Sequence, residues 1–347
     1  MGTVADMGAS AINRKWVVAS RPEAEITAGN FELQEAPVPE LPDGAMLLKT
    51  RYLTVSPPAR MALVSGGIAR RPIAIGATMR GTGLAQVVES KHAEFASGDL
   101  VLGDLGWQEF AVSDGVRRRP VRKVQAPPGH PESTLLHVLG GGGATAYFGM
   151  TEYCKPRPGD TLVVSTAAGS VGAILCQLGR LQGCRVVGIA GGPAKCDWLV
   201  KELGCAAAID YKGETLSERL DETCPDGIDI YFDNVGGETL DAALARITQG
   251  ARVVLCGGTS QYNHDLDWYG PKNYFNLVYK QAEMAGFYVF NFADRFAEAH
   301  ARLAALIDAG DLIYREDVLE GLENAPEALM RLFRGDNFGV QLVRVAD

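Results

Sequence analysis

The chain of 347 residues has little positive charge and no cysteine among its first 153 positions. Its 33 Lys and Arg residues are outnumbered by 42 Asp and Glu residues, which gives a net charge of −9. Nucleic-acid binding needs clustered basic side chains, so this balance argues against a nucleic-acid partner. The sequence has no run of about 20 apolar residues, so we expect no membrane partner and no spanning helix. It also lacks the apolar segment of a signal peptide.

The seven cysteines form no C-x-x-C pair and no short disulfide framework. We expect free thiols in a reducing compartment, which predicts a cytoplasmic protein. Zinc needs Cys, His or carboxylate ligands, and His92, His130 and His137 have no ligand-like spacing. Four closely spaced cysteines for a structural zinc are also missing. The sequence therefore predicts no metal site.

Glycine is abundant, at 41 residues or about 12% of the chain against a usual level of about 7%. Extra glycine indicates tight turns, or backbone that approaches a ligand closely. The hydrophobic content of 47% and the charged content of 22% are those of a globular protein. At roughly 100–200 residues per domain, the length predicts two domains.

The first 130 residues are rich in Pro and Gly and contain short runs typical of strands. These runs predict an irregular β domain with strands at residues 45–50, 83–88, 100–103 and 109–112. A helical pattern follows at residues 135–150, and four consecutive glycines, Gly140 to Gly143, interrupt it. This glycine run is either a flexible connector or a hinge that lies against a ligand.

From residue 160, short apolar runs alternate with amphipathic segments. Strands are predicted at residues 161–165, 185–189, 206–209, 229–232, 252–255 and 284–287. Helices of 8–12 residues between such strands predict βαβ units on a parallel sheet, which is an α/β doubly wound fold. A further helix is expected at residues 295–308 and a last strand at residues 340–345.

The turn after the first of these strands reads A-x-G-x-x-G, from Ala167 to Gly172. It lies between a buried strand and an amphipathic helix, the context in which this motif binds the pyrophosphate of a dinucleotide. Gly169 would let the backbone approach the phosphates, and Gly172 would let the helix pack closely on the strand. The helix N-terminus would then offer its free N–H groups to the phosphates. The alternative is a tight turn with no ligand.

The end of the second strand decides which dinucleotide is expected. NAD sites usually carry an Asp or Glu there, which accepts a hydrogen bond from the ribose 2′-OH. This chain has Gly191 and Gly192 followed by Lys195, so we expect no carboxylate, open space and a cation for a 2′-phosphate. The pattern favours NADP(H). The alternative for Lys195 is a solvated residue in the first turn of a helix.

Six segments, AAGSVG, GIAGGPAKCDWLVKELG, IDYK, FDNVGGE, LCGGTSQYN and GDNFG, carry a resemblance to one family. In order and spacing they resemble the zinc-independent medium-chain reductases, typified by leukotriene B4 12-hydroxydehydrogenase/prostaglandin reductase, NADPH-dependent curcumin reductase and alkenal double-bond reductases. The resemblance covers nearly the whole chain. It implies a Rossmann NADP(H)-binding domain at residues 138–290 and a GroES-like catalytic domain made of residues 1–137 and 291–347.

The resemblance also implies which residues bind NADPH. The pyrophosphate would lie against Gly169, Ser170, Val171 and Gly172. The adenosine 2′-phosphate end would lie against Gly191, Lys195 and Tyr211. The remaining cofactor contacts would come from Asn234, from Cys256, Gly257, Gly258, Thr259 and Ser260 along the nicotinamide side, from Phe287, Tyr288 and Val289 behind the ring, and from Asn337 in the returning C-terminal segment.

A chain without zinc ligands favours conjugate hydride transfer to an activated alkene over reduction of a simple carbonyl. The expected function is NADPH-dependent reduction of the C=C bond of α,β-unsaturated ketones and aldehydes. Negative charge then develops on the carbonyl oxygen as an enolate, which needs a neutral hydrogen-bond donor. Tyr262, with a phenol pKa near 10, has this chemistry, and the family places a tyrosine at this position. The alternative for Tyr262 is a loop aromatic packed on the cleft wall.

Two other functions stay open, an NADPH:quinone oxidoreductase and a non-catalytic NADPH-binding sensor or structural protein. Relatives usually carry S-V-D-P-Y-M-R where this chain has T-V-S-P-P-A-R, so Ala59 replaces an aromatic of the substrate pocket. The glycine run likewise replaces the usual G-M-P-G. Both departures leave the substrate open. We expect a homodimer joined through the edge strand at residues 284–287, because an uncovered edge would expose unpaired backbone groups.

Overall fold

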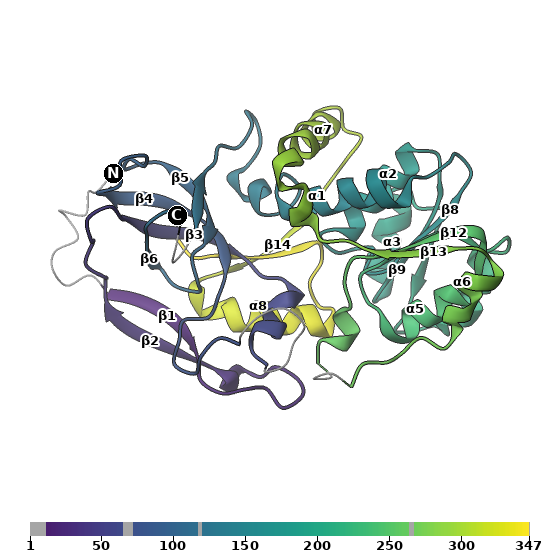
Figure 1. Cartoon of the computed structure of the whole chain (residues 1–347), viewed down its shortest axis with the longest axis horizontal. Coiled ribbons are helices and arrows are strands. Elements are labelled where there is room, and N and C mark those ends of the chain that lie inside the picture. The colour runs from purple at the N-terminus through teal and green to yellow at the C-terminus, as the bar shows by residue number, and fades with distance from the viewer. Residues whose placement is uncertain (1–11, 65–71, 117–119, 264–266, 347) are drawn as a thin grey trace. The chain divides into compact units, whose positions relative to one another are not determined.

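The computed structural model describes residues 12–64, 72–116, 120–263 and 267–346. The chain divides into two compact units, and Figure 1 labels many of their helices and strands. The β-rich unit comprises residues 1–136, 317–337 and 341–347. The parallel-sheet unit comprises residues 137–316 and 338–340.

The β-rich unit is built on a sheet that, among the described residues, has seven strands. The strand order is β14-β15-β3-β4-β5-β7, with β6 also paired to β3. The strands are β3 (Met46–Thr54), β4 (Thr82–Ser90), β5 (Leu100–Asp104), β6 (Phe110–Ser113), β7 (Val121–Lys123), β14 (Glu316–Glu320) and β15 (Val340–Arg344). Strands β14 and β15, from the C-terminal part of the chain, therefore belong to the same sheet as the strands from its N-terminal part. A separate antiparallel pair consists of β1 (Ile12–Val18) and β2 (Phe31–Pro37).

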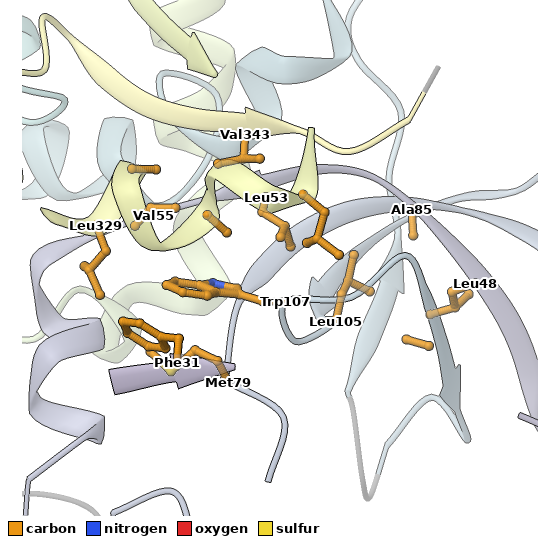
Figure 2. Packing of buried hydrophobic residues seen from close by; sticks show 14 of the residues in the cluster. Phe31, Leu48, Leu53, Val55, Met79, Ala85, Leu105, Trp107, Leu329 and Val343 are labelled. Carbon is orange, nitrogen blue, oxygen red and sulfur yellow. The ribbon is translucent and has the colours of Figure 1, made fainter. Parts of the chain in front are cut away.

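Trp107 lies at the centre of the core of the β-rich unit and is 1% exposed. Its ring centroid lies 5.3 Å from that of Phe31. Figure 2 shows the indole among Phe31, Met79 and Leu329, the last from α8 (Ala325–Arg334). The sequence analysis did not predict β1, β2 or α8. The two strands carry several charged side chains, which hide the alternation of apolar and polar residues.

The parallel-sheet unit confirms the predicted doubly wound fold. Its strand order is β10-β9-β8-β11-β12-β13, and the pairs are parallel. The strands are β8 (Thr161–Val164), β9 (Arg185–Ala190), β10 (Ala207–Asp210), β11 (Ile228–Asp233), β12 (Ile247–Leu255) and β13 (Glu283–Gly286). The order reverses between β8 and β11, and in such sheets ligands bind beyond the carboxyl ends of the strands at this point.

Helices cover both faces of this sheet, as its burial on both sides requires. Figure 1 shows α2 on one side and α5 on the other. The connecting helices are α2 (Gly172–Leu181), α3 (Pro193–Lys201), α4 (Leu216–Thr223), α5 (Gly237–Leu244) and α6 (Asn276–Tyr279). Leu162, Val163 and Val164 of β8 are fully buried, which explains the continuous apolar run in the sequence.

The domain boundary expected at residues 290 and 291 differs from this division, because residues 291–316 pack within the parallel-sheet unit. Helix α7 (Phe296–Asp308) buries Ala299 against Ala144 and Phe148 of α1 (Gly141–Phe148). Ile313, which follows α7, is also attached to this unit. The Gln177 side chain of α2 donates to Ile313 O at 2.9 Å and accepts from the Ile313 N–H at 2.8 Å. These contacts attach the segment to the parallel-sheet unit.

The glycine run begins α1 and does not interrupt a helix, since Gly140 is its N-cap residue. A Cβ atom added to Gly143 would clash with the carbonyl group of Val138, and one added to Gly142 would lie 2.7 Å from Ser170 Oγ. By contrast, no atom lies within 4 Å of a Cβ atom added to Gly141. The run is therefore a closely packed helix start against the A-x-G-x-x-G turn, and not a free connector.

This packing predicts opposite effects for two neighbouring substitutions. Gly143→Ala should lower the free energy of unfolding by about 1–3 kcal/mol, because a backbone carbonyl must move to admit the methyl group. Gly141→Ala is the matched control and should be neutral or stabilising by up to about 1 kcal/mol, because alanine is the better helix former. Urea unfolding of both variants checks this, and equal effects of the two would contradict the packing argument.

Candidate active site

The carboxyl ends of the six parallel strands bring the predicted site residues together. The turn with Gly169 to Gly172 follows β8, Gly191 follows β9 and Tyr211 follows β10. In the same way, Asn234 follows β11, the segment from Cys256 to Tyr262 follows β12, and the segment from Phe287 to Val289 follows β13. Asn337 belongs to the β-rich unit, so its expected contact with the cofactor stays a prediction.

The turn between β8 and α2 forms a cradle that only small residues allow. A Cβ atom added to Gly172 would clash with the carbonyl oxygen of Thr166, and one added to Gly169 would lie 2.9 Å from Thr166 Cγ2. Thr166 itself has a φ of 51°, in the left-handed region that β-branched residues rarely adopt. Helix α2 begins at Gly172, after the turn that follows β8. In its first turn the Ala173 N–H donates to Gly169 O at 3.1 Å, so the remaining N–H groups of this helix start are the ones that suit a phosphate.

At the end of β9, side chains cover the space that the sequence predicted to be open. A Cβ atom added to Gly191 would lie 2.9 Å from the Tyr211 ring and 3.0 Å from Lys212 Cε. Gly192, with a φ of 92°, begins α3, and Lys195 stands in the first turn of that helix. Tyr211 and Lys212 thus lie against Gly191, and Lys195 stands in the helix that follows. Lys212 is not among the residues predicted from the sequence.

The expectation of no carboxylate beside these glycines is wrong. Asp210, the last residue of β10, accepts hydrogen bonds from the N–H groups of Gly192 at 2.8 Å and Lys212 at 3.0 Å. The first of these bonds is the main cause that lowers the pKa of the Asp210 carboxyl. Strand β10 lies beside β9, so an acid distant in sequence reaches the turn. The Asp210 carboxylate thus accepts hydrogen bonds from two backbone N–H groups, and the nearby Lys212 cation also stabilises its negative charge.

A buried carboxylate, Asp233, organises the end of β11 and is 1% exposed. Its Oδ1 accepts from Tyr231 Oη at 2.9 Å, from Ser165 Oγ at 3.2 Å and from the N–H groups of Val235 and Gly236 at 3.0 Å. Burial raises the pKa of Asp233, and these hydrogen bonds oppose that shift. This residue lies within the FDNVGGE segment, and the sequence predicts no role for it.

Asn234 is held on the carboxyl end of β8. Its backbone N–H donates to Ser165 Oγ at 2.8 Å, and its side-chain Nδ2 donates to Ser165 O at 2.7 Å. The carbonyl oxygen of Asn234 accepts from Thr259 Oγ1 at 2.9 Å. Asn234 therefore connects the end of β8 with the loop after β12.

The loop after β12 is tied down on the turn after β11. Cys256 N–H donates to Asp233 O at 2.8 Å, and Ser260 Oγ donates to Val235 O at 2.7 Å. Burial raises the pKa of the Cys256 thiol to about 12, so this thiol is neutral.

Tyr262 ends this loop with its hydroxyl oxygen bound to the backbone. That oxygen accepts from the Gly258 N–H at 3.2 Å, which leaves the phenol's own hydrogen to donate to another acceptor. Burial raises the pKa of the Tyr262 phenol above its ordinary value of 10. The group is therefore a neutral, oriented donor.

The segment after β13 packs mostly against its own unit. The Phe287 ring stacks on Tyr153, with centroids 4.8 Å apart, and Val289 packs on the cluster around Phe148. Tyr288 is 53% exposed and lies beside Phe290, with centroids 5.2 Å apart. The predicted position of these three residues behind a nicotinamide ring stays a prediction.

Over the described ranges, no group of three or more His, Cys, Asp or Glu side chains is arranged to hold a metal ion. The Nε2 atom of His137, one of the histidines considered above, lies 2.6 Å from Oε1 of Glu316. Within the same ranges, no helix is both long enough and apolar enough to cross a membrane.

Comparisons with known proteins agree with this arrangement. Residues 14–121 match a family model described as the N-terminal domain of oxidoreductase, and residues 170–305 match one described as zinc-binding dehydrogenase. The NADPH-dependent curcumin reductase of Escherichia coli is 38% identical, over 96% of this chain and 97% of that protein. Prostaglandin reductase 1 of Bos taurus is 35% identical, over 95% and 98%. The crystal structure of CurA in complex with NADPH from Vibrio vulnificus covers 96% of this chain and 99% of that one, at 40% identity and a TM-score of 0.90.

The parallel nucleotide-binding sheet, the β-rich companion unit and these matches define an oxidoreductase of the medium-chain dehydrogenase/reductase superfamily. Within it, the chain belongs to the family that includes the curcumin reductases, prostaglandin reductase 1 and the NADP-dependent 2-alkenal reductases.

Proposed function

We propose that this protein uses NADPH to reduce the C=C bond of α,β-unsaturated ketones and aldehydes, with Tyr262 as donor to the substrate carbonyl oxygen. The observation that carries the proposal is the Tyr262 phenol, a neutral donor whose oxygen is fixed by the Gly258 N–H at 3.2 Å. The names of the relatives support the same chemistry, since they include curcumin and 2-alkenal reductases.

The residues of the parallel-sheet unit fit the cofactor. A pyrophosphate would lie against the turn whose close packing requires Gly169 and Gly172, and the N-terminus of α2 would offer it N–H groups. Lys195 and Tyr211 would hold the 2′-phosphate. When bound, NADPH supplies the hydride for the reduction.

The chain's own contribution to the reaction is electrostatic. As the C=C bond is reduced, negative charge develops on the carbonyl oxygen of the substrate, and a hydrogen bond from Tyr262 stabilises it. The hydrogen bond from the Gly258 N–H to the Tyr262 hydroxyl opposes rotation of the phenol away from the substrate carbonyl oxygen. Because burial raises the pKa of Tyr262, the donor keeps its proton throughout the neutral range.

Tyr262→Phe should lower kcat by about tenfold to a hundredfold. Loss of one such donor typically costs 10²–10³, and the family resemblance implies that the nicotinamide ribose hydroxyl would share the role. The affinity for NADPH should barely change. The raised pKa also fixes the pH dependence, since the donor is lost only when the pH rises above about 10. An unchanged kcat in the variant, with chemistry shown to be rate-limiting, would remove Tyr262 from the mechanism.

The reaction itself is tested with deuterium-labelled NADPH. We expect the label on the β-carbon of an enone, and a label on the carbonyl carbon would indicate an ordinary ketone reductase. Parallel panels of enones and quinones distinguish the proposed function from an NADPH:quinone oxidoreductase. A protein that binds NADPH but oxidises it with neither panel would be the non-catalytic alternative.

Lys195→Ala should narrow the preference for NADPH over NADH by about tenfold or more, because a hydrogen bond to a charged group contributes about 1.5–3 kcal/mol. Lys201→Ala in the same helix is the matched control, because Lys201 is exposed and pairs with Asp197 at 2.8 Å. Catalytic efficiencies with both cofactors provide the measurement. Equal efficiencies in the unmutated protein would refute the assignment of the 2′-phosphate site.

We also propose a homodimer joined along β13, which ends the described sheet. Exposed apolar side chains border this edge, including Phe275, Val278 and Tyr279 with exposed fractions of 51%, 63% and 71%. Such a patch beside an open strand edge suits a second copy of the chain. Light scattering should give about twice the chain mass of 37.1 kDa, and Tyr279→Asp should shift the mass toward the monomer. A single-chain mass at micromolar concentration would contradict the dimer.

A further inference from the structure

The C-terminal part of the chain enters the parallel-sheet unit with only three residues, Phe338 to Val340, which we call the strap. Gly339 donates its N–H to the carbonyl oxygen of Ala168 at 3.0 Å and forms an isolated parallel bridge with Gly169. Val340 donates its N–H to Arg315 O, also at 3.0 Å. The strap is therefore bound directly to the backbone of the A-x-G-x-x-G turn.

The strap also reaches the helix that carries Lys195. The Phe338 ring meets the Trp198 indole edge-on, with centroids 5.1 Å apart and an interplanar angle of 89°. The Arg315 guanidinium lies 3.9 Å from the centroid of the same Phe338 ring. Trp198 stands three residues after Lys195 in α3, so the two side chains are neighbours on one face of the helix.

Close approach of the strap depends on glycine. Gly339 has a φ of 83°, and a Cβ atom added to it would clash with the carbonyl group of Arg315. Trp198 is 5% exposed, so its contact with Phe338 is part of the packed interior. The strap thus has one backbone attachment to the turn and one aromatic attachment to α3.

We infer that Phe338 is a positioning residue for the adenosine end of the cofactor. Through Trp198 it holds α3, which carries Lys195, and through Gly339 it holds the turn that carries Gly169. The pyrophosphate cradle and the 2′-phosphate cation are thereby kept in a fixed relation before the nucleotide arrives, which lowers the ordering cost of binding. The inference rests on the proposed cofactor site and adds to it a residue that touches neither phosphate.

The test measures the affinity for adenosine 2′,5′-bisphosphate and for NADP⁺ by titration calorimetry. Phe338→Ala should weaken both by about five- to tenfold, because α3 and the turn must then be ordered when the nucleotide binds. Phe338→Tyr keeps the ring and should bind within about twofold of the unmutated protein. With saturating NADPH, kcat should hardly change while KM for NADPH rises, a division that a general loss of structure would not produce.

Leu220→Ala is the control for lost stability, because it truncates a fully buried side chain of α4 in the same unit. It should leave the affinity for both nucleotides unchanged. If Phe338→Ala fails to fold, Phe338→Leu keeps apolar bulk without a ring and should show the same weakening.

Three outcomes would overturn the inference. They are unchanged affinity in both Phe338→Ala and Phe338→Leu, equal weakening in Leu220→Ala, and failure of Phe338→Tyr to restore binding. If Lys195→Ala weakens binding and the Phe338 variants do not, only the role of the strap is wrong. If Lys195→Ala also has no effect, the cofactor site itself is misassigned.

Discussion

The pairing of β8 with β11 is the contact on which the site depends. Its register places Val164 opposite Phe232, so Ser165 and Asp233 leave the sheet side by side. The phosphate turn continues from the first of these residues, and the turn with Asn234 continues from the second. The strand order reverses at this pair, and in sheets of this kind ligands bind beyond the carboxyl ends of the strands at such a reversal. The two central loops of the proposed site therefore begin at the position where this class of fold binds its ligands.

Asp233 turns that pairing into a fixed geometry. A carboxylate that is 1% exposed costs free energy to bury unless donors surround it, and the side chains of Tyr231 and Ser165 and two backbone N–H groups provide them. Burial still raises its pKa, so the folded chain binds this proton more tightly than the unfolded chain does. The group therefore favours folding at low pH and opposes it once it is ionised. The backbone carbonyl oxygen of Asp233 accepts a hydrogen bond from the Cys256 N–H. The position of Asp233 therefore also constrains the loop that ends at Tyr262.

The sequence predicted the parallel sheet well because its inner strands β8, β9 and β11 are buried along nearly all their length and read as apolar runs. Strand β8 and helix α2 are examples, and the A-x-G-x-x-G turn between them lies where the motif requires. The sequence could not predict contacts between distant segments. Asp210 reaches Gly192 only because β10 lies beside β9, and residues 291–316 join the parallel-sheet unit only because α7 packs on α1. No spacing along the chain carries that information.

The cofactor half of the site was accessible to sequence reasoning because much of its chemistry belongs to the backbone. Glycines at positions 169 and 172 are needed wherever a helix starts this close to a strand, whichever substrate is reduced. Substrate choice depends on side chains, and here the chain departs from its relatives. Ala59 lies in the 3-10 helix Pro57–Ala62 and packs against the core of the β-rich unit, so no aromatic ring occupies that position. The family resemblance implies an aromatic of the substrate pocket at this position, so we predict that the methyl group of Ala59 admits bulkier acceptors, and these are the substrates to compare first.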